Sequence, residues 1–127
     1  MVENVKQLLI AVMTNSLEKV RELIESGMDV NAADESGTTA LNMAAMENIV
    51  GIAEYLIDSG ADIHTRNIEG GTPLIIAARN NAGNVLKLLI ERGADINAVD
   101  AQGGTALSHA EDHNFTEIIS ILKQFGA

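Results

Sequence analysis

The stretch GTPLIIAA, residues 71–78, recurs along this chain at a fixed spacing. A shift of 33 residues aligns it with TTALNMAA at 38–45 and with GTALSHAE at 104–111. Self-similarity in several separate registers indicates a chain built from one repeating structural unit. The same shift relates the glycines that open GMDVN, GADIH and GADIN and a set of asparagines, at Gly27, Gly60, Gly93, Gly126, Asn15, Asn48, Asn81 and Asn114.

Each repeat contains the signals of a first short helix. Thr72 stands at the N-cap position, and Pro73 follows at the first helical position, where its missing N–H is tolerated. Thr39 and Thr105 occupy the same register. The small and apolar residues that follow are predicted to face neighbouring units, and the alanines among them would let helices approach closely. These residues are Leu41, Ala44, Ala45, Leu74, Ala77 and Ala78.

A second helix is predicted between each asparagine and the next glycine. Asn tolerates a left-handed backbone better than other non-glycine residues, so four Asn at one register predict one recurring left-handed turn. Gly60 and Gly93 are predicted to follow the ends of these helices as C′ residues. Apolar residues spaced i, i+3, i+4 mark the packing face, namely Ala53, Leu56, Ile57, Leu86, Leu89 and Ile90.

These motifs resemble the ankyrin repeat family over essentially the whole chain. The resemblance is carried by GTPLIIAA (71–78), the Leu88–Leu89 pair, GADIN (93–97) and their copies. It implies an all-α solenoid of stacked helix–turn–helix units with protruding β-hairpin or loop fingers, forming a single domain over 1–127. The histidine that follows Thr-Pro-Leu in the family is replaced here, which weakens its bracing of the threonine. The replacements are Asn42, Ile75 and Ser108.

The end units are interpreted as caps of a complete short solenoid. The first lacks the hairpin and the Thr-Pro-Leu-like start, and the last stops at its terminal Gly-Ala. In the last unit, positions that are apolar in the sister units become His109, Glu111 and Lys123. A terminal unit needs such a polar outer face. The predicted units are 1–33 as N-terminal cap, 34–66, 67–99 and 100–127 as C-terminal cap.

Composition and charge narrow the class of function. The chain of 127 residues has a net charge of −10, whereas a nucleic-acid binder needs Lys and Arg to neutralise phosphates. Nucleic acid is therefore not an expected partner, and a basic protein is favoured. No apolar run approaches the roughly 18 residues of a membrane span, and no signal-peptide pattern is visible. No membrane association is expected, and the chain is predicted to be cytoplasmic.

The loop GADINAVD, residues 93–100, has oxygen-bearing side chains of the kind found in calcium sites. Asp95, Asn97 and Asp100 bring oxygen ligands together, but the EF-hand spacing requires Gly at position 6 and Glu at position 12. Counted from Asp95, those positions hold Asp100 and Ala106. We therefore interpret the loop as a structural turn, with Ile96 packed inward.

A second cluster offers an alternative function as a metal-binding or hydrolytic protein. It comprises His109, Glu111 and His113, with the two histidines four residues apart. Zinc hydrolases of this helical type need Glu directly after the first His, and here that residue is Ala110. The chain also lacks Cys and a Gly-x-Ser-x-Gly elbow. We expect no metal site, no cofactor and no enzymatic activity.

The resemblance to ankyrin repeats implies a non-catalytic protein–protein interaction module. Proteins of this family mostly bind partners through hairpin tips and the exposed face of the first helix. Carried over by register, the implied partner-binding residues are Met13, Glu35, Met46, Glu47, Arg66, Ile68, Glu69, Arg79, Asn80, Val99, Ala101, Gln102, Asp112 and His113, with Thr14, Ala33, Ser36, Thr38, Gly71 and Gly104 at further variable positions.

Four of these residues are favoured as contacts. Ile68 is an apolar residue at a finger tip where sister units carry Glu35 and Ala101. Met46 is apolar on the groove side, and Arg66 and Arg79 could pair bidentately with a partner's carboxylates. A narrower hypothesis is an inhibitor or immunity-type protein that blocks the active site of a partner enzyme. A monomer is expected, because polar caps disfavour end-to-end stacking.

Overall fold

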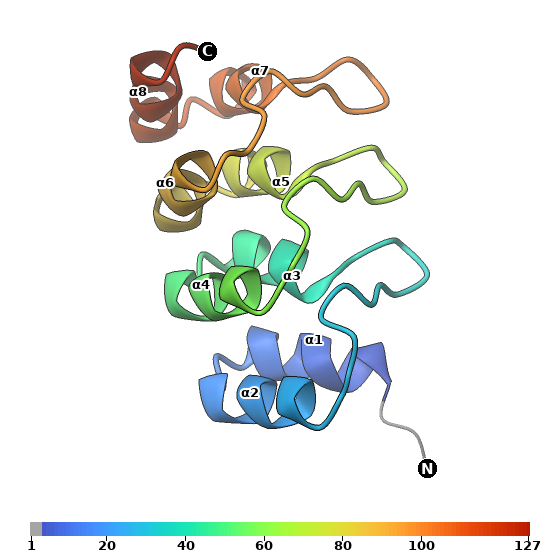
Figure 1. The fold of residues 1–127 in the computed structure, drawn as a ribbon. Helices are drawn as coiled ribbons and strands as arrows, with labels where there is room; N and C mark the ends of the chain where they lie inside the picture. Colours follow the sequence, from blue (N-terminus) through green and yellow to red (C-terminus); the bar gives the residue numbers. More distant parts are fainter. Residues whose placement is uncertain (1–3) are drawn as a thin grey trace.

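A computed structural model describes residues 4–127 of the chain, in which eight helices alternate with turns and loops (Figure 1). Helices pair as consecutive antiparallel neighbours, and the pairs stack into an elongated array. Within the described residues no regular β-strand forms. The helices are α1 (Val5–Met13), α2 (Leu17–Glu25), α3 (Ala40–Glu47), α4 (Val50–Asp58), α5 (Pro73–Arg79), α6 (Gly83–Glu91), α7 (Ala106–Asp112) and α8 (Thr116–Gln124).

The stack has two rows of helices and one row of fingers. Helices α1, α3, α5 and α7 form the row next to the fingers, and α2, α4, α6 and α8 form the row behind it (Figure 1). Successive members of the first row contact one another directly. The predicted packing residues Leu41, Ala44 and Ala45 are buried there, as are Leu74, Ala77 and Ala78. Short alanine side chains bring neighbouring units close, which confirms the predicted all-α solenoid.

The predicted threonine caps start three helices of the first row. Thr72 Oγ1 accepts the Ile75 backbone N–H at 3.3 Å, and Pro73 is the first residue of α5. Thr39 and Thr105 cap α3 and α7 in the same manner, at 3.2 and 3.0 Å. Each cap satisfies one of the backbone donors that a helix start leaves without a partner. The starts of these three helices thus follow from local chemistry.

The four repeat asparagines adopt the predicted left-handed backbone. Their φ angles lie between 56° and 58°, and they separate the two helices of each unit. Asn48 also ties two units together, because its Oδ1 accepts the Val85 backbone N–H at 3.1 Å. Gly60 and Gly93 have positive φ angles just beyond α4 and α6, as predicted.

The fingers are tight turns rather than regular hairpins. Ala33 and Thr39 form an isolated antiparallel bridge, and side chains hold the turns. Asp100 Oδ1 accepts the N–H groups of Gln102 and Gly104 at 3.0 and 2.8 Å. Asp34 and Asn67 make the corresponding pairs of bonds in the two preceding fingers. The Asp100 carboxylate, one of the suggested calcium ligands, therefore stabilises the turn of its own finger. Ile96, earlier in the same loop, is partly buried against the core.

Backbone hydrogen bonds join each finger to the next. The Ile68 N–H donates to Ser36 O, and the Ala101 N–H donates to Glu69 O, both at 3.0 Å. A glycine permits this approach, since a Cβ on Gly70 would lie 2.6 Å from the Ala101 nitrogen. The three fingers therefore form one continuous surface, in which these backbone hydrogen bonds fix each finger against its neighbour.

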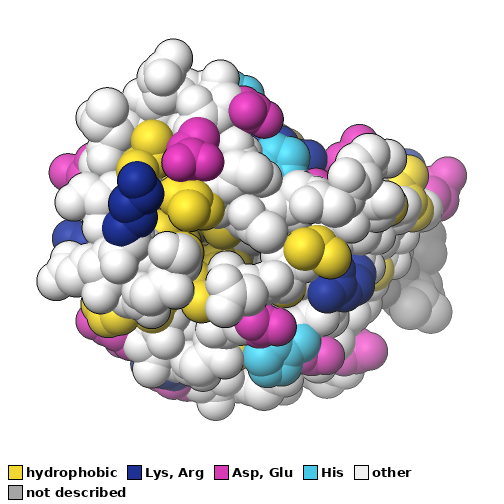
Figure 2. Space-filling model, turned by 90° about the horizontal axis from the view of Figure 1, so that it is seen from above, with side chains coloured by type: hydrophobic (Ala, Val, Ile, Leu, Met, Phe, Trp, Pro, Cys, Tyr) yellow, Lys and Arg dark blue, Asp and Glu magenta, His cyan; other side chains and the backbone are white. Residues whose placement is uncertain are grey.

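The C-terminal unit is only partly polar on its outer side. Glu111 and Lys123 are exposed, as expected for a cap, whereas His109 is partly buried. Seen from above in Figure 2, apolar side chains still gather over the unit formed by α7 and α8, beside acidic ones. Leu107, Phe115 and Ile119 are among its partly exposed apolar residues.

Candidate protein-binding groove

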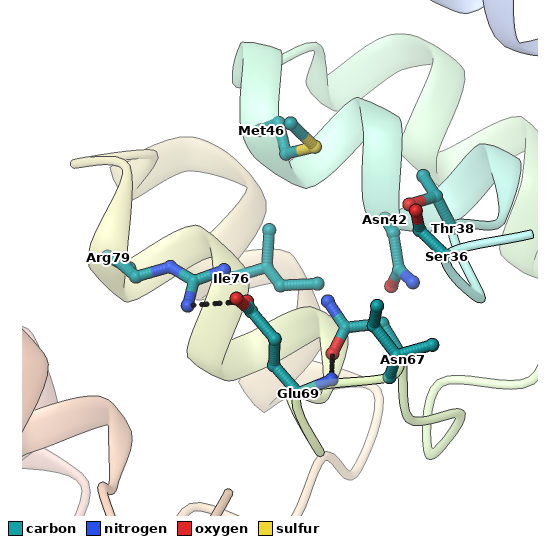
Figure 3. Close-up of a pocket in the computed structure, with 9 residues that line it drawn as sticks. Ser36, Thr38, Asn42, Met46, Asn67, Glu69, Ile76 and Arg79 are labelled. Atoms are coloured by element: carbon teal, nitrogen blue, oxygen red, sulfur yellow. Dashed lines mark hydrogen bonds and ion pairs between the residues drawn. The ribbon is translucent and has the colours of Figure 1, made fainter.

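A groove lies between the second and third units, at the base of their fingers. Its volume is about 240 Å³. One side comes from the finger before α3 and from α3 itself, and the other from the next finger and α5 (Figure 3). It therefore combines the two surfaces on which partner binding was expected. The lining residues are Ser36, Thr38, Asn42, Met46, Asn67, Ile68, Glu69, Ile76 and Arg79.

The apolar part of the groove is exposed where the sequence suggested it. Ile68 is 74% exposed at the finger tip, and Met46 is 41% exposed near the end of α3. Ile76 lines the same groove but is itself buried. A side chain as exposed as Ile68 contributes little to folding, because hydrophobic stabilisation scales with the area removed from water. The same area remains available for burial against a partner.

Arg79 and Glu69 form a charged pair at this site. Arg79 Nη1 lies 3.4 Å from Glu69 Oε1, and the Glu69 side chain is 62% exposed (Figure 3). Such an exposed pair contributes little stability. It does orient the guanidinium toward a carboxylate of its own chain, so a partner's carboxylate would have to share or displace that contact.

Arg66 is engaged inside the molecule as well. Its Nη1 donates to the Gly70 carbonyl at 2.9 Å and also to the Val99 carbonyl. The side chain therefore links the finger of the third unit to the start of the finger of the fourth unit. The sequence predicts that Arg66 pairs with carboxylates of a partner, but register alone does not give the distances that place it on these two carbonyls.

Asn42 lies at the bottom of the groove and was not among the predicted contacts. The residue is completely buried, and its Nδ2 donates to Gly37 O at a long 3.4 Å. Its Oδ1 has no hydrogen-bond partner within the described residues. A buried carbonyl oxygen without a donor is uncommon and unfavourable. The signal visible in the sequence was the departure from the family's histidine at this register.

The other predicted contacts lie outside the groove lining. Met13, Glu35, Glu47 and Val99 are exposed. So are Asn80, Ala101, Gln102, Asp112 and His113. The Asn80 side chain caps its own helix by donating to Ile76 O at 2.8 Å. The exposed position of these residues fits a contact surface, but the structure does not bring them into one cavity.

The two histidines of the alternative metal cluster point to different partners. His109 Nε2 donates to Asp100 Oδ2 at 2.7 Å, and His113 Nδ1 donates to the His109 carbonyl at 2.9 Å. The His113 ring also stacks on Phe115, with centroids 5.1 Å apart. No group of three or more potential metal ligands occurs among residues 4–127.

The His109–Asp100 contact is a second feature that sequence reasoning missed. The Asp100 side chain is almost fully buried. The hydrogen bond from His109, reinforced by the Gly104 and Gln102 N–H groups, holds the pKa of Asp100 below its ordinary value. His109 was interpreted as a polar cap residue, yet it braces the base of the last finger. Only this unit pairs an Asp with a His at these two registers.

Comparisons with known proteins agree with this architecture. A family model described as ankyrin repeats (3 copies) matches residues 3–67, and one described as ankyrin repeats (many copies) matches residues 56–110. A search of curated proteins found no match. Over the described residues, the helices are too short or too polar for any of them to cross a bilayer.

Proposed function

Because this chain belongs to the ankyrin repeat family, we propose that it is a non-catalytic module that binds a partner protein across the fingers and the groove between the second and third units. Ankyrin repeats are generally protein-interaction modules. The observation that carries the proposal is Ile68, which is 74% exposed on a finger held to its neighbour by the bond to Ser36 O. An apolar side chain on a fixed backbone loses little further entropy on binding.

The charge of the molecule supports a basic partner surface. The chain carries a net charge of −10. Glu35 and Glu69 are exposed on the fingers beside the groove, and Glu47 is exposed at the end of α3. Attraction of this kind accelerates association and weakens as salt screens it. We therefore expect partner association to slow with increasing ionic strength.

A selection experiment with two matched variants tests the proposal. A library of displayed protein fragments is first selected on the immobilised wild-type protein. The binding of the selected fragments to Ile68→Asp and to Val50→Asp is then compared. Val50 is 41% exposed on α4, in the row of helices away from the fingers. It is the first residue of that helix, where Asp is tolerated. Both changes add the same charge.

The proposal expects binders to be lost on Ile68→Asp and kept on Val50→Asp. Retention of the same binders by both variants would place the interface elsewhere and contradict the proposal. An inhibitor that covers an enzyme's active site is a narrower form of this function, and inhibition of a selected enzyme would test it. The monomeric state and the cytoplasmic location stay predictions, to be checked by sedimentation and by cell fractionation.

A further inference from the structure

Among the described residues, the Asn42 amide oxygen has no hydrogen-bond partner. Carbonyl oxygens do not donate, so Gly37 O can be approached only by the amide nitrogen, at 3.4 Å. Oδ1 is therefore turned away from Gly37. The residue lines the groove, and its side chain extends toward the space beside Asn67 and Ile76 (Figure 3). The groove thus has a buried hydrogen-bond acceptor with its donor missing.

The fold does not require an asparagine at this position. The corresponding residue of the next unit is Ile75, which is 1% exposed and packs in the core. In the last unit it is Ser108, whose hydroxyl accepts the Thr105 N–H at 2.8 Å. An apolar side chain, or a polar one that finds a hydrogen-bond partner within its own unit, can therefore occupy this position. Of the three residues at this register, only Asn42 leaves a buried polar atom unpaired within the described part of the chain, and a ligand that supplies a donor would remove this penalty.

The surroundings favour a long basic side chain as the donor. Met46, Ile68 and Ile76 line the groove with apolar surface that suits the methylene stem of lysine or arginine. Glu69 faces the same space, and its pairing with Arg79 involves only Oε1. An acidic group would instead place its own oxygen against Oδ1, which can only accept.

We propose, resting on the protein-binding function above, that this groove takes up one lysine or arginine side chain of the partner, whose N–H group donates to Asn42 Oδ1 while Glu69 faces its charge. In the free protein Oδ1 is covered. The donor therefore reaches Oδ1 only after a side chain of the groove lining shifts, and the flexible thioether of Met46 is suited to such a shift. The partner is thus recognised by a basic residue flanked by apolar ones.

Short peptides that differ only at their central residue test this inference. Five acetylated and amidated peptides carry arginine, lysine, citrulline, norleucine or glutamate between leucines. Each is titrated at millimolar concentration into isotopically labelled protein, and nuclear magnetic resonance follows the Asn42 side-chain amide and the Met46 methyl group. Citrulline keeps the N–H donors of arginine without its charge, so it separates hydrogen bonding from attraction to an acidic protein.

The arginine and lysine peptides are expected to shift both signals and to bind roughly tenfold more tightly than the norleucine peptide. Citrulline should retain part of this preference, and glutamate should bind most weakly. Asn42→Ile leaves the net charge unchanged and carries the residue that the next unit has at this register. In this variant arginine and norleucine peptides should bind equally.

Three results would overturn the inference. They are equal affinity of arginine and norleucine peptides for the wild-type protein, an arginine preference that survives Asn42→Ile, and the absence of binding by every peptide. The first two would still leave a groove that binds polypeptides. The proposed function itself fails only when Ile68→Asp retains the selected binders, so the two failures can be told apart.

Discussion

Replacing Asn42 with isoleucine is expected to stabilise the free protein, although it should impair binding. The change removes a buried, unpaired carbonyl oxygen, which costs about 1–3 kcal/mol, and it buries a larger apolar side chain, worth about 1.5–3 kcal/mol. Against this stand the long bond to Gly37 O, about 1 kcal/mol, and crowding by the larger side chain, about 1–3 kcal/mol. The corresponding Ile75 is accommodated in the next unit, so crowding should lie at the lower end.

With crowding at about 1 kcal/mol, the contributions give a net rise of about 2 kcal/mol in the free energy of unfolding, or about 6–10 °C in the melting temperature. Urea unfolding followed by circular dichroism measures it, with the midpoint moving and the slope unchanged. The reverse change, Ile75→Asn, is the matched control and should lose about 3 kcal/mol, because it buries an amide where no partner is known. A loss of 1 kcal/mol or more in Asn42→Ile would refute the view that Oδ1 is an unfavourable orphan.

Three further outcomes are expected. Asp100→Ala should lower the free energy of unfolding by about 2–3 kcal/mol, because three accepted hydrogen bonds disappear. Asp100→Asn should lose less, since Asn67 makes the same turn in another unit. Urea unfolding would show whether the alanine variant is the less stable of the two. Because the pKa of Asp100 is lowered in the folded protein, its ionised form adds stability that is present above pH 3.8, its usual pKa, and is lost as the pH falls below that value. The difference in free energy of unfolding between wild type and Asp100→Asn, measured at several pH values, should therefore shrink in acid. A difference that grows in acid would contradict this expectation. Asn48→Ala should lower the free energy of unfolding by about 2–3 kcal/mol, because alanine is strained in the left-handed backbone and the Val85 N–H loses its acceptor. Asn48→Gly adopts the same backbone without strain and should recover about half of that loss in the same assay.

The helices and their turns could be predicted because they depend on neighbours in the sequence. Thr72 caps its helix by accepting the N–H of the residue three positions later. The turn at Asn48 depends only on the tolerance of asparagine for a positive φ. A period of 33 residues then extends each local conclusion to the other units. The fold could thus be assigned from residues whose roles are local and repeated.

The groove was predicted only in outline, since its details depend on side-chain contacts that the repeat register does not give. Register predicted that Ile68 lies at a finger tip and Met46 on the groove side, and both line the groove. It could not show that Arg66 binds the Val99 carbonyl of a neighbouring finger, or that Arg79 faces Glu69 of the finger in its own unit, because both contacts depend on how the side chains extend in space. The unpaired oxygen of Asn42 was equally hidden, since it follows from the absence of a nearby donor.

The central claim is that a partner protein binds at the fingers and groove around Ile68. Its most direct test is an isothermal titration of one selected binder into wild-type protein, Ile68→Asp and Val50→Asp. An apolar contact at the centre of an interface contributes about 2 kcal/mol or more. Ile68→Asp should therefore raise the Kd by at least about thirtyfold, with Val50→Asp close to wild type. Equal Kd values for all three proteins would contradict the account.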